Sequence, residues 1–275
     1  MPDLSVHQYP VTGRLGRHHV LDPRSLAYVR PYAGQPLTTA EWEPKIPVLD
    51  QQDLLAQGID TDTLFPGVGT VDALGSCTGN AGTAVVSALL TKDEATAAGL
   101  DTDDPVAAEE WAIRLYADAT RADTWHGHQW PKEDCGSSGL GVAKVLKARG
   151  LADQYGHATT AEQFAVLLQY GMVLMGMPWP RAFFEPTTKT AVLDAIPGWQ
   201  DSPIDGGHEV AVTALEAITF TRAGRLDTAR TILRVRNSWS KSWGDDGCFR
   251  MSLALYEALR SQIDLIQPRR DPGRA

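Results

Sequence analysis

The distribution of apolar residues changes character near Tyr170, and this change limits the fold more than any other feature of the sequence. Before it, small and apolar residues from Cys77 onward and amphipathic patterns over residues 104–123 and 138–150 predict three helices. After it, apolar runs are short and are separated by Gly and Pro, which is typical of strands. Helices followed by strands predict an α+β protein with two unlike lobes and a cleft between them.

The length favours a single domain built from two packed lobes, because 275 residues can bury one large core. We expect four segments along the chain. They are an extended N-terminal segment (1–45), a helical lobe (46–168), an antiparallel β-rich lobe (169–265) and a disordered tail (266–275). The two lobes together form one domain over residues 46–265.

Composition and charge exclude several classes of partner. The formal net charge is −9 and basic residues are scattered, which gives no electrostatic footprint for nucleic acid or an anionic membrane. The sequence shows no apolar signal-peptide core at its start and no apolar run long enough to span a membrane. We therefore expect cytoplasmic synthesis, with export by another route left open.

The cysteine count argues against a disulfide framework and against zinc. Three cysteines, Cys77, Cys135 and Cys248, guarantee at least one free thiol in a monomer, and none stands at the close spacing of a structural zinc site. His126 and His128 stand two apart, but they lack an acidic or cysteine partner at useful spacing. The sequence therefore predicts no metal and no cofactor.

Cys77 has two possible roles. Cysteine is often buried as inert packing, and this is the common role of a cysteine in a helical pattern. Here, however, Gly75 and Ser76 form a turn just before it, so Cys77 falls in the first turn of a helix. The helix dipole and the free amides at that position stabilise a thiolate.

The second half of the chain supplies partners for a thiolate. His208 follows a Gly-Gly pair and opens an apparent strand, so its ring can project at the cleft edge. Asn237 follows another apolar run, and Trp239 and Trp243 come shortly after it. An asparagine carbonyl that accepts the imidazole N–H fixes its tautomer, and aromatic rings shield that bond from water.

These three motifs together resemble those of the papain-like (C1-type) cysteine peptidases, in which Cys, His and Asn occur in this order. LGSCTGNA is similar to the nucleophile motif of the bacterial and phage branch, and GGHEV and NSWSKSWGDDGCF are similar to the histidine and asparagine motifs. His208 lies 131 residues after Cys77, and Asn237 lies 160 residues after it. The resemblance covers residues 46–259 and implies a papain-like two-lobed fold with a Cys77–His208–Asn237 triad, supported by Ser76, Trp239 and Trp243.

The sequence departs from the family at the glutamine that helps to hold the oxyanion. That glutamine is expected six residues before the nucleophile, where this chain has Val71. An alternative alignment, with an insertion before the nucleophile, assigns the role to Gln51, with Gln57 in reserve. Residues 47–72 otherwise predict loop and turn. A smaller departure is Ser240, which replaces the glycine after the Asn-Ser-Trp triplet.

The resemblance implies a cysteine endopeptidase that cleaves peptide or protein substrates through a thioester acyl-enzyme. Two alternatives stay open: a catalytically inactive binding or structural protein with the same fold, and a phage-type peptidoglycan peptidase or acyl transferase. No N-terminal stretch is long enough for the inhibitory propeptide usual in secreted members. We expect the N-terminal segment to be a structural strap, with a contribution to the cleft as the alternative.

Overall fold

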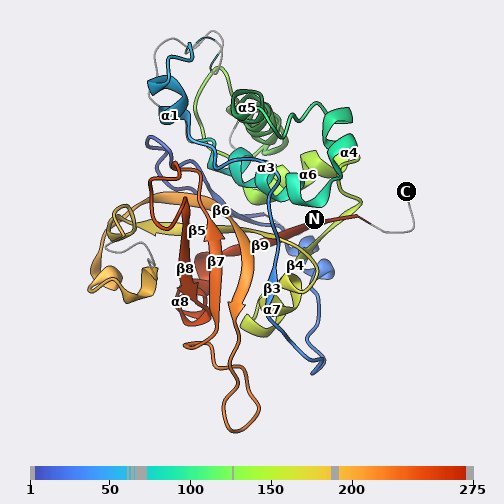
Figure 1. Ribbon diagram of the computed structural model, residues 1–275, viewed down its shortest axis with the longest axis vertical. Helices are drawn as coiled ribbons and strands as arrows, with labels where there is room; N and C mark the ends of the chain where they lie inside the picture. Colours follow the sequence, from blue (N-terminus) through green and yellow to red (C-terminus); the bar gives the residue numbers. More distant parts are fainter. Residues whose placement is uncertain are drawn as a thin grey trace.

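A computed structural model describes residues 4–60, 62, 65, 73–125, 127–186 and 192–270. In that part of the chain, helices gather on one side and a sheet on the other (Figure 1). The predicted α+β class, with two unlike lobes, is therefore confirmed. The helical side consists of α1 (Gln51–Ala56), α3 (Cys77–Leu89), α4 (Lys92–Ala97), α5 (Pro105–Ala122) and α6 (Gly139–Ala148).

Each of the three predicted helices is present and starts at a recognisable signal. The Asp104 side chain accepts hydrogen bonds from the first amides of α5, and Ser138 caps α6 by accepting from the Gly141 amide. Helix α3 begins at Cys77 and packs closely against α5, since a Cβ on Gly79 would lie 2.2 Å from the Ala112 carbonyl oxygen. This close approach fixes α3, and with it Cys77, against the helical lobe.

One antiparallel sheet of seven strands spans the other lobe, counted over the described residues. Its order is β4-β9-β5-β6-β7-β8, and β3 pairs with β6. The strands are β3 (Ala40–Glu41), β4 (Gln154–His157), β5 (Val173–Pro180), β6 (Ile204–Ala217), β7 (Ile232–Arg236), β8 (Cys248–Ser252) and β9 (Asp264–Arg269). The short strands β1 (Ser5–His7) and β2 (His19–Leu21) form a separate antiparallel pair.

The sheet is covered by helices that belong to its own core. These are α7 (Ala161–Leu168) and α8 (Leu253–Leu259). The described chain also contains short 3-10 turns, namely η1 (Pro23–Tyr28), η2 (Arg181–Phe183), η3 (Leu193–Ala195), η4 (Trp199–Asp201) and η5 (Arg260–Gln262). Phe164 of α7 and Trp179 of β5 lie in one apolar core, whereas α3, α5 and α6 enclose a second core with Trp111. β5 is buried along its whole length, which makes it the centre of the molecule.

Three expectations about the chain course are corrected. Within residues 47–72, which predict loop and turn, Gln51–Ala56 form α1, a helix too short to show a period and defined mainly by its Asp50 cap. α7 lies in the predicted helical lobe but packs into the core of the sheet. Residues 266–269, assigned to a disordered tail, form the buried end of β9.

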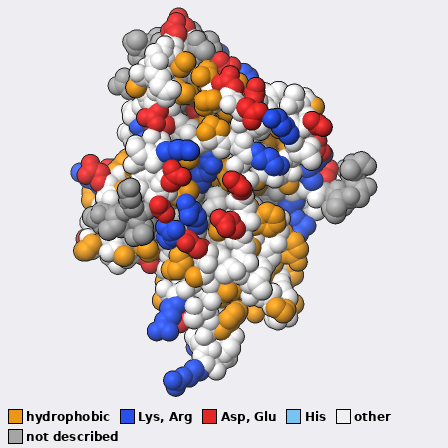
Figure 2. Space-filling model, viewed as in Figure 1, with side chains coloured by type: hydrophobic (Ala, Val, Ile, Leu, Met, Phe, Trp, Pro, Cys, Tyr) orange, Lys and Arg blue, Asp and Glu red, His pale blue; other side chains and the backbone are white. Residues whose placement is uncertain are grey.

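The surface mixes charges of both signs on the face shown in Figure 2, where basic and acidic side chains alternate over the helical and sheet sides. Among the described residues, no helix is both long enough and apolar enough to cross a membrane.

Candidate active site

The structure brings the predicted Cys, His and Asn together where the two lobes meet. Cys77 is the first residue of α3, His208 lies in β6, and Asn237 follows the end of β7. The His208 Nε2 atom lies 2.7 Å from Asn237 Oδ1. The amide of Glu209, directly after His208, donates to the Cys77 sulfur at 3.4 Å. Cys77 therefore lies beside the strand that carries the histidine.

The Asn237 contact defines which ring nitrogen of His208 is available. Because Asn237 Oδ1 accepts the hydrogen bond, Nε2 carries the proton in the neutral ring. The other nitrogen, Nδ1, is buried and has no hydrogen-bond partner among the described residues. An imidazole held in this way has its basic lone pair free to take a proton from a nucleophile.

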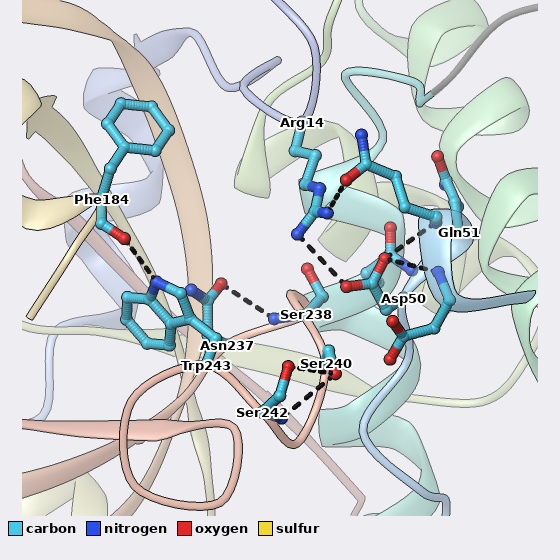
Figure 3. A network of polar contacts seen from close by, with 12 residues as sticks. Arg14, Asp50, Gln51, Phe184, Asn237, Ser238, Ser240, Ser242 and Trp243 are labelled. Carbon is cyan, nitrogen blue, oxygen red and sulfur yellow. Dashed lines mark hydrogen bonds and ion pairs between the residues drawn. The ribbon is translucent and has the colours of Figure 1, made fainter. Parts of the chain in front are cut away.

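Aromatic rings enclose the imidazole on two sides. Trp239 stacks on His208 at 4.6 Å between ring centroids, and Trp179 meets it edge-on at 4.7 Å. Trp243 supports Trp239 at 5.4 Å, and its indole N–H donates to the Phe184 carbonyl at 2.7 Å (Figure 3). These rings exclude water from the His208–Asn237 bond, which strengthens it.

Trp179 was not singled out from the sequence. It lies near the end of the apolar run of β5, and nothing in that run distinguishes it from a core residue. The pairing register of β5 with β6, which sets Trp179 opposite Gly206, is what brings it to His208.

Gln51 lies in a buried network directly behind the nucleophile. Its Nε2 donates to Ser76 Oγ and to Glu109 Oε1, both at 2.7 Å, and its Oε1 accepts from the Leu74 amide at 2.8 Å. Gln51 and Cys77 also line one small pocket of about 10 Å³. Gln57, the reserve, is exposed at the end of α1 and does not line this pocket. Val71 lies outside the described residues.

Burial keeps Cys77 and His208 uncharged in this conformation. Desolvation raises the pKa of Cys77 to about 12, although the amides of Glu209 and Gly16 oppose the shift by donating to its sulfur. Desolvation likewise lowers the pKa of His208 to about 4, against the Asn237 hydrogen bond. At neutral pH the pair is therefore a thiol and a neutral imidazole, and an ion pair requires that water or substrate reach the site.

A segment of the N-terminus causes this burial. Residues 9–18, here called the N-terminal strap, connect β1 to β2 and run between the helices and the sheet (Figure 1). The amide of Arg17 donates to the Gly207 carbonyl at 3.0 Å, and Ser137 exchanges two backbone bonds of 2.8 Å with Gly16 and His18. The strap is thus attached to both lobes, across Cys77.

The strap fits too closely to leave room for a side chain at Gly16. A Cβ on that residue would lie 1.8 Å from the Gly75 carbonyl oxygen, which belongs to the turn before Cys77. On the neighbouring side, Arg14 reaches Gln52 and pairs with Asp50 at 3.2 Å, beside Gln51 and Asn237 (Figure 3). As a result Cys77 is only 2% exposed and His208 is fully buried.

The network behind Cys77 predicts a pH-dependent stability. Glu109 is fully buried, and desolvation raises its pKa from 4.5 to about 7. The hydrogen bonds that Asn80 and Gln51 donate to its carboxylate oppose this rise. Because this carboxyl binds its proton more tightly in the folded state than in the unfolded state, its protonation stabilises the fold. That stabilisation is lost as the pH rises from about 4.5 to 7, and the free energy of unfolding falls by roughly 3 kcal/mol. We expect Glu109→Gln to remove this contribution, so that the variant loses less stability than the wild type between pH 5 and pH 7, as measured by urea unfolding.

The matched control for that measurement is Glu110→Gln. Glu110 is the next residue of α5, is one-third exposed and pairs with Arg114 at the surface. The pH profile of this variant should follow that of the wild type. If the stability of Glu109→Gln falls with pH as much as that of the wild type, ionisation of Glu109 does not destabilise the fold.

No group of three or more His, Cys, Asp or Glu side chains suited to a metal occurs in the described ranges. His128 pairs with Glu133 at 2.5 Å, whereas His126 lies outside the described residues. Cys135 and Cys248 are free and half-buried.

Comparison with known proteins places the fold. No profile of a known protein family and no curated protein sequence matches the chain. Among solved structures, it is similar to xylellain, a cysteine protease from Xylella fastidiosa, at 16% identity and a TM-score of 0.58 over 94% of this chain and 97% of that one. Weaker likenesses are to digestive procathepsin L 3 of Tenebrio molitor (14% identity, TM-score 0.49, 90% and 78% of the two chains) and to bromelain of Ananas comosus with the E64 inhibitor (13%, 0.40, 72% and 90%). The chain therefore has the papain-like fold.

Proposed function

We propose that the protein is a papain-like cysteine peptidase of the bacterial and phage branch. The observation that carries the proposal is the 2.7 Å contact of His208 Nε2 with Asn237, which leaves Nδ1 without a hydrogen-bond partner among the described residues, while the next amide along the strand, that of Glu209, donates to the sulfur of helix-borne Cys77. A nucleophile, a base and a residue that orients the base are the three parts that acyl transfer by a thiol requires.

The reaction follows from these three residues. His208 Nδ1 takes the thiol proton, and the Cys77 sulfur attacks a peptide carbonyl to form a tetrahedral intermediate. His208 then returns the proton to the leaving amine, so the C–N bond breaks and a thioester with Cys77 forms. Water, deprotonated by His208, attacks the thioester and releases the carboxylic acid and the free thiol. Asn237 keeps the imidazole oriented throughout.

Gln51 is proposed to hold the oxyanion together with the Cys77 amide. Support for this role comes from the pocket that Gln51 shares with Cys77. Both Nε2 protons of Gln51 are donated in the present conformation, to Ser76 and Glu109, so one of these bonds has to be exchanged for the oxyanion. Because the amide is already desolvated and held by its carbonyl, such an exchange costs little reorganisation.

Substrate access requires the strap to move. A peptide cannot reach a sulfur that is 2% exposed, and the strap occupies the backbone partners Gly207 and Ser137 on both sides of it. We therefore place the active state in a conformation with the strap displaced.

This covered site is also the observation that favours the second candidate, a non-catalytic protein of the same fold. Cleavage of peptidoglycan peptides stays a prediction of the sequence motif alone.

The test is hydrolysis of internally quenched peptides by the chain carrying Gly16→Ala, which displaces the strap. Adding Cys77→Ala or His208→Ala should lower kcat/KM by about 10⁴-fold or more, and Cys248→Ala, at a half-buried thiol away from the site, should leave it unchanged. Equal residual activity in the Cys77→Ala chain would remove Cys77 as the nucleophile. Absence of hydrolysis in the opened chain over a diverse peptide library would favour the non-catalytic candidate.

A further inference from the structure

The strap places one charged side chain in the interior of the protein. Arg17 is fully buried, and its Nη2 donates to the Asp264 carboxylate and to the Gln262 carbonyl at 3.1 Å. The Tyr9 ring closes the outer side, with its centroid 5.7 Å from the Arg17 Cζ atom. A guanidinium so enclosed occupies a pocket built around it.

The pocket offers two carboxylates to one guanidinium. Glu209 is 1% exposed, and neither of its carboxylate oxygens has a hydrogen-bond partner among the described residues. Arg17 Nε and Nη1 are unpartnered in the same way. The three charged groups converge on Gly176, since a Cβ there would lie 2.3 Å from Arg17 Nε, 2.7 Å from Asp264 Oδ1 and 2.8 Å from Glu209 Oε2. The missing side chain at Gly176 is what makes room for the guanidinium.

The pocket is adjacent to the reacting groups. Glu209 directly follows His208, and its amide donates to the Cys77 sulfur at 3.4 Å. The backbone of Arg17 is held by the carbonyl of Gly207, the residue just before His208. A peptide that takes the place of the strap between the lobes therefore has one side chain directed at Glu209 and Asp264.

We infer that Glu209, Asp264 and Gly176 form the specificity pocket of the site, that it takes the guanidinium of a substrate arginine, and that Arg17 occupies it in cis. This inference rests on the proposed function, because only a peptidase has a peptide substrate at this site. Asp264 pairs with a cation here and Glu209 adds a second buried carboxyl group, and the planar fork of a guanidinium matches the two better than the point charge of lysine. A neutral side chain leaves the Asp264 carboxylate buried and unpaired, so the pocket rejects it.

Binding tests the inference without catalysis. The probes are the blocked tripeptide amides Ac-Gly-Arg-Gly-NH₂ and its citrulline counterpart, which has the same shape but no charge. They are titrated calorimetrically into the full chain carrying Cys77→Ala, Arg17→Met and Gly16→Ala, the last of which displaces the strap. The arginine peptide should bind at least about tenfold more tightly than the citrulline peptide, and Asp264→Asn should abolish the difference. With Arg17 present and the strap unaltered, both peptides should bind at least about tenfold more weakly.

Equal affinity for the two peptides in the folded Arg17→Met chain overturns the inference, and so does the absence of binding by either. If Arg17→Met does not fold, Gly16→Ala in the Cys77→Ala background displaces the strap with all three charged groups intact, and the same outcomes apply to it. Hydrolysis is read separately. Arginine-selective binding without cleavage would reject the peptidase and keep the pocket, whereas cleavage indifferent to arginine would do the opposite.

Discussion

Replacing Gly16 with alanine is expected to raise the rate at which iodoacetamide alkylates Cys77 by on the order of 10²-fold. The added methyl group would overlap the Gly75 carbonyl oxygen at 1.8 Å, so the strap cannot stay against the turn before Cys77. Its departure admits water, removes the desolvation that holds the thiol pKa at about 12, and lets His208 form an ion pair with the thiolate. Intact mass and peptide mapping at pH 6 measure the rate.

Thr12→Ala is the matched control, because Thr12 lies in the same strap with its side chain exposed. Cys248, which lies in β8, serves as an internal reference for general loosening of the fold. If Cys77 in a folded Gly16→Ala chain reacts no faster than in the wild type, the strap is not what protects it. Faster reaction that survives His208→Ala would show exposure without an ion pair.

Arg17→Met is expected to lower the free energy of unfolding by about 3 kcal/mol at pH 8. The substitution keeps an unbranched apolar stem but leaves Asp264 and Glu209 buried without their cation, and removing one partner of a buried pair typically costs about 3–5 kcal/mol. Urea unfolding measures it. Arg181→Met is the control, since Arg181 is largely exposed and pairs with Asp205 at 2.9 Å on the surface, which predicts a loss below about 1 kcal/mol.

The loss should depend on pH in a defined direction. Burial raises the pKa of Glu209 from 4.5 to about 8 even with Arg17 present, and the charge of Arg17 opposes that rise. Without Arg17 the pKa rises further. Both folded chains keep this carboxyl protonated at lower pH and lose stability in parallel, so the variant carries an additional cost only above about pH 8, where Glu209 ionises in the wild type. The deficit of Arg17→Met should therefore be larger at about pH 9.5 than at about pH 7. A deficit that is equal at both values would show that Glu209 does not take part.

The fold class and the main helices were predictable because local signals define them. Asp104 and Ser138 are caps, and the run from Cys77 has the small residues that a closely packed helix needs. α1 and the end of β9 were missed because each is short and is stabilised by its surroundings, namely the Asp50 cap and the neighbouring strands β4 and β5. Such elements carry too few residues to show a period.

The candidate triad could be proposed from residue type, order and spacing, and its catalytic roles stay predictions. The pairing register that sets Trp179 against His208 and the burial of Arg17 could not be foreseen, because both depend on residues far apart in the sequence. Ser240 lies between these cases. It replaces a glycine expected from the family motif, and its φ of 72° shows that the backbone keeps the left-handed conformation that glycine favours.

The position of β9 in the sheet has a consequence for synthesis of the chain on the ribosome. Among the described strands β9 is made last, yet it lies between β4 and β5 in the interior of the sheet, and it carries Asp264, which holds Arg17. A nascent chain that has emerged only as far as β8 therefore has neither a finished sheet nor an anchor for its strap. Assembly of the candidate active site and its closure by the strap consequently depend on the same strand, so neither is complete before the other.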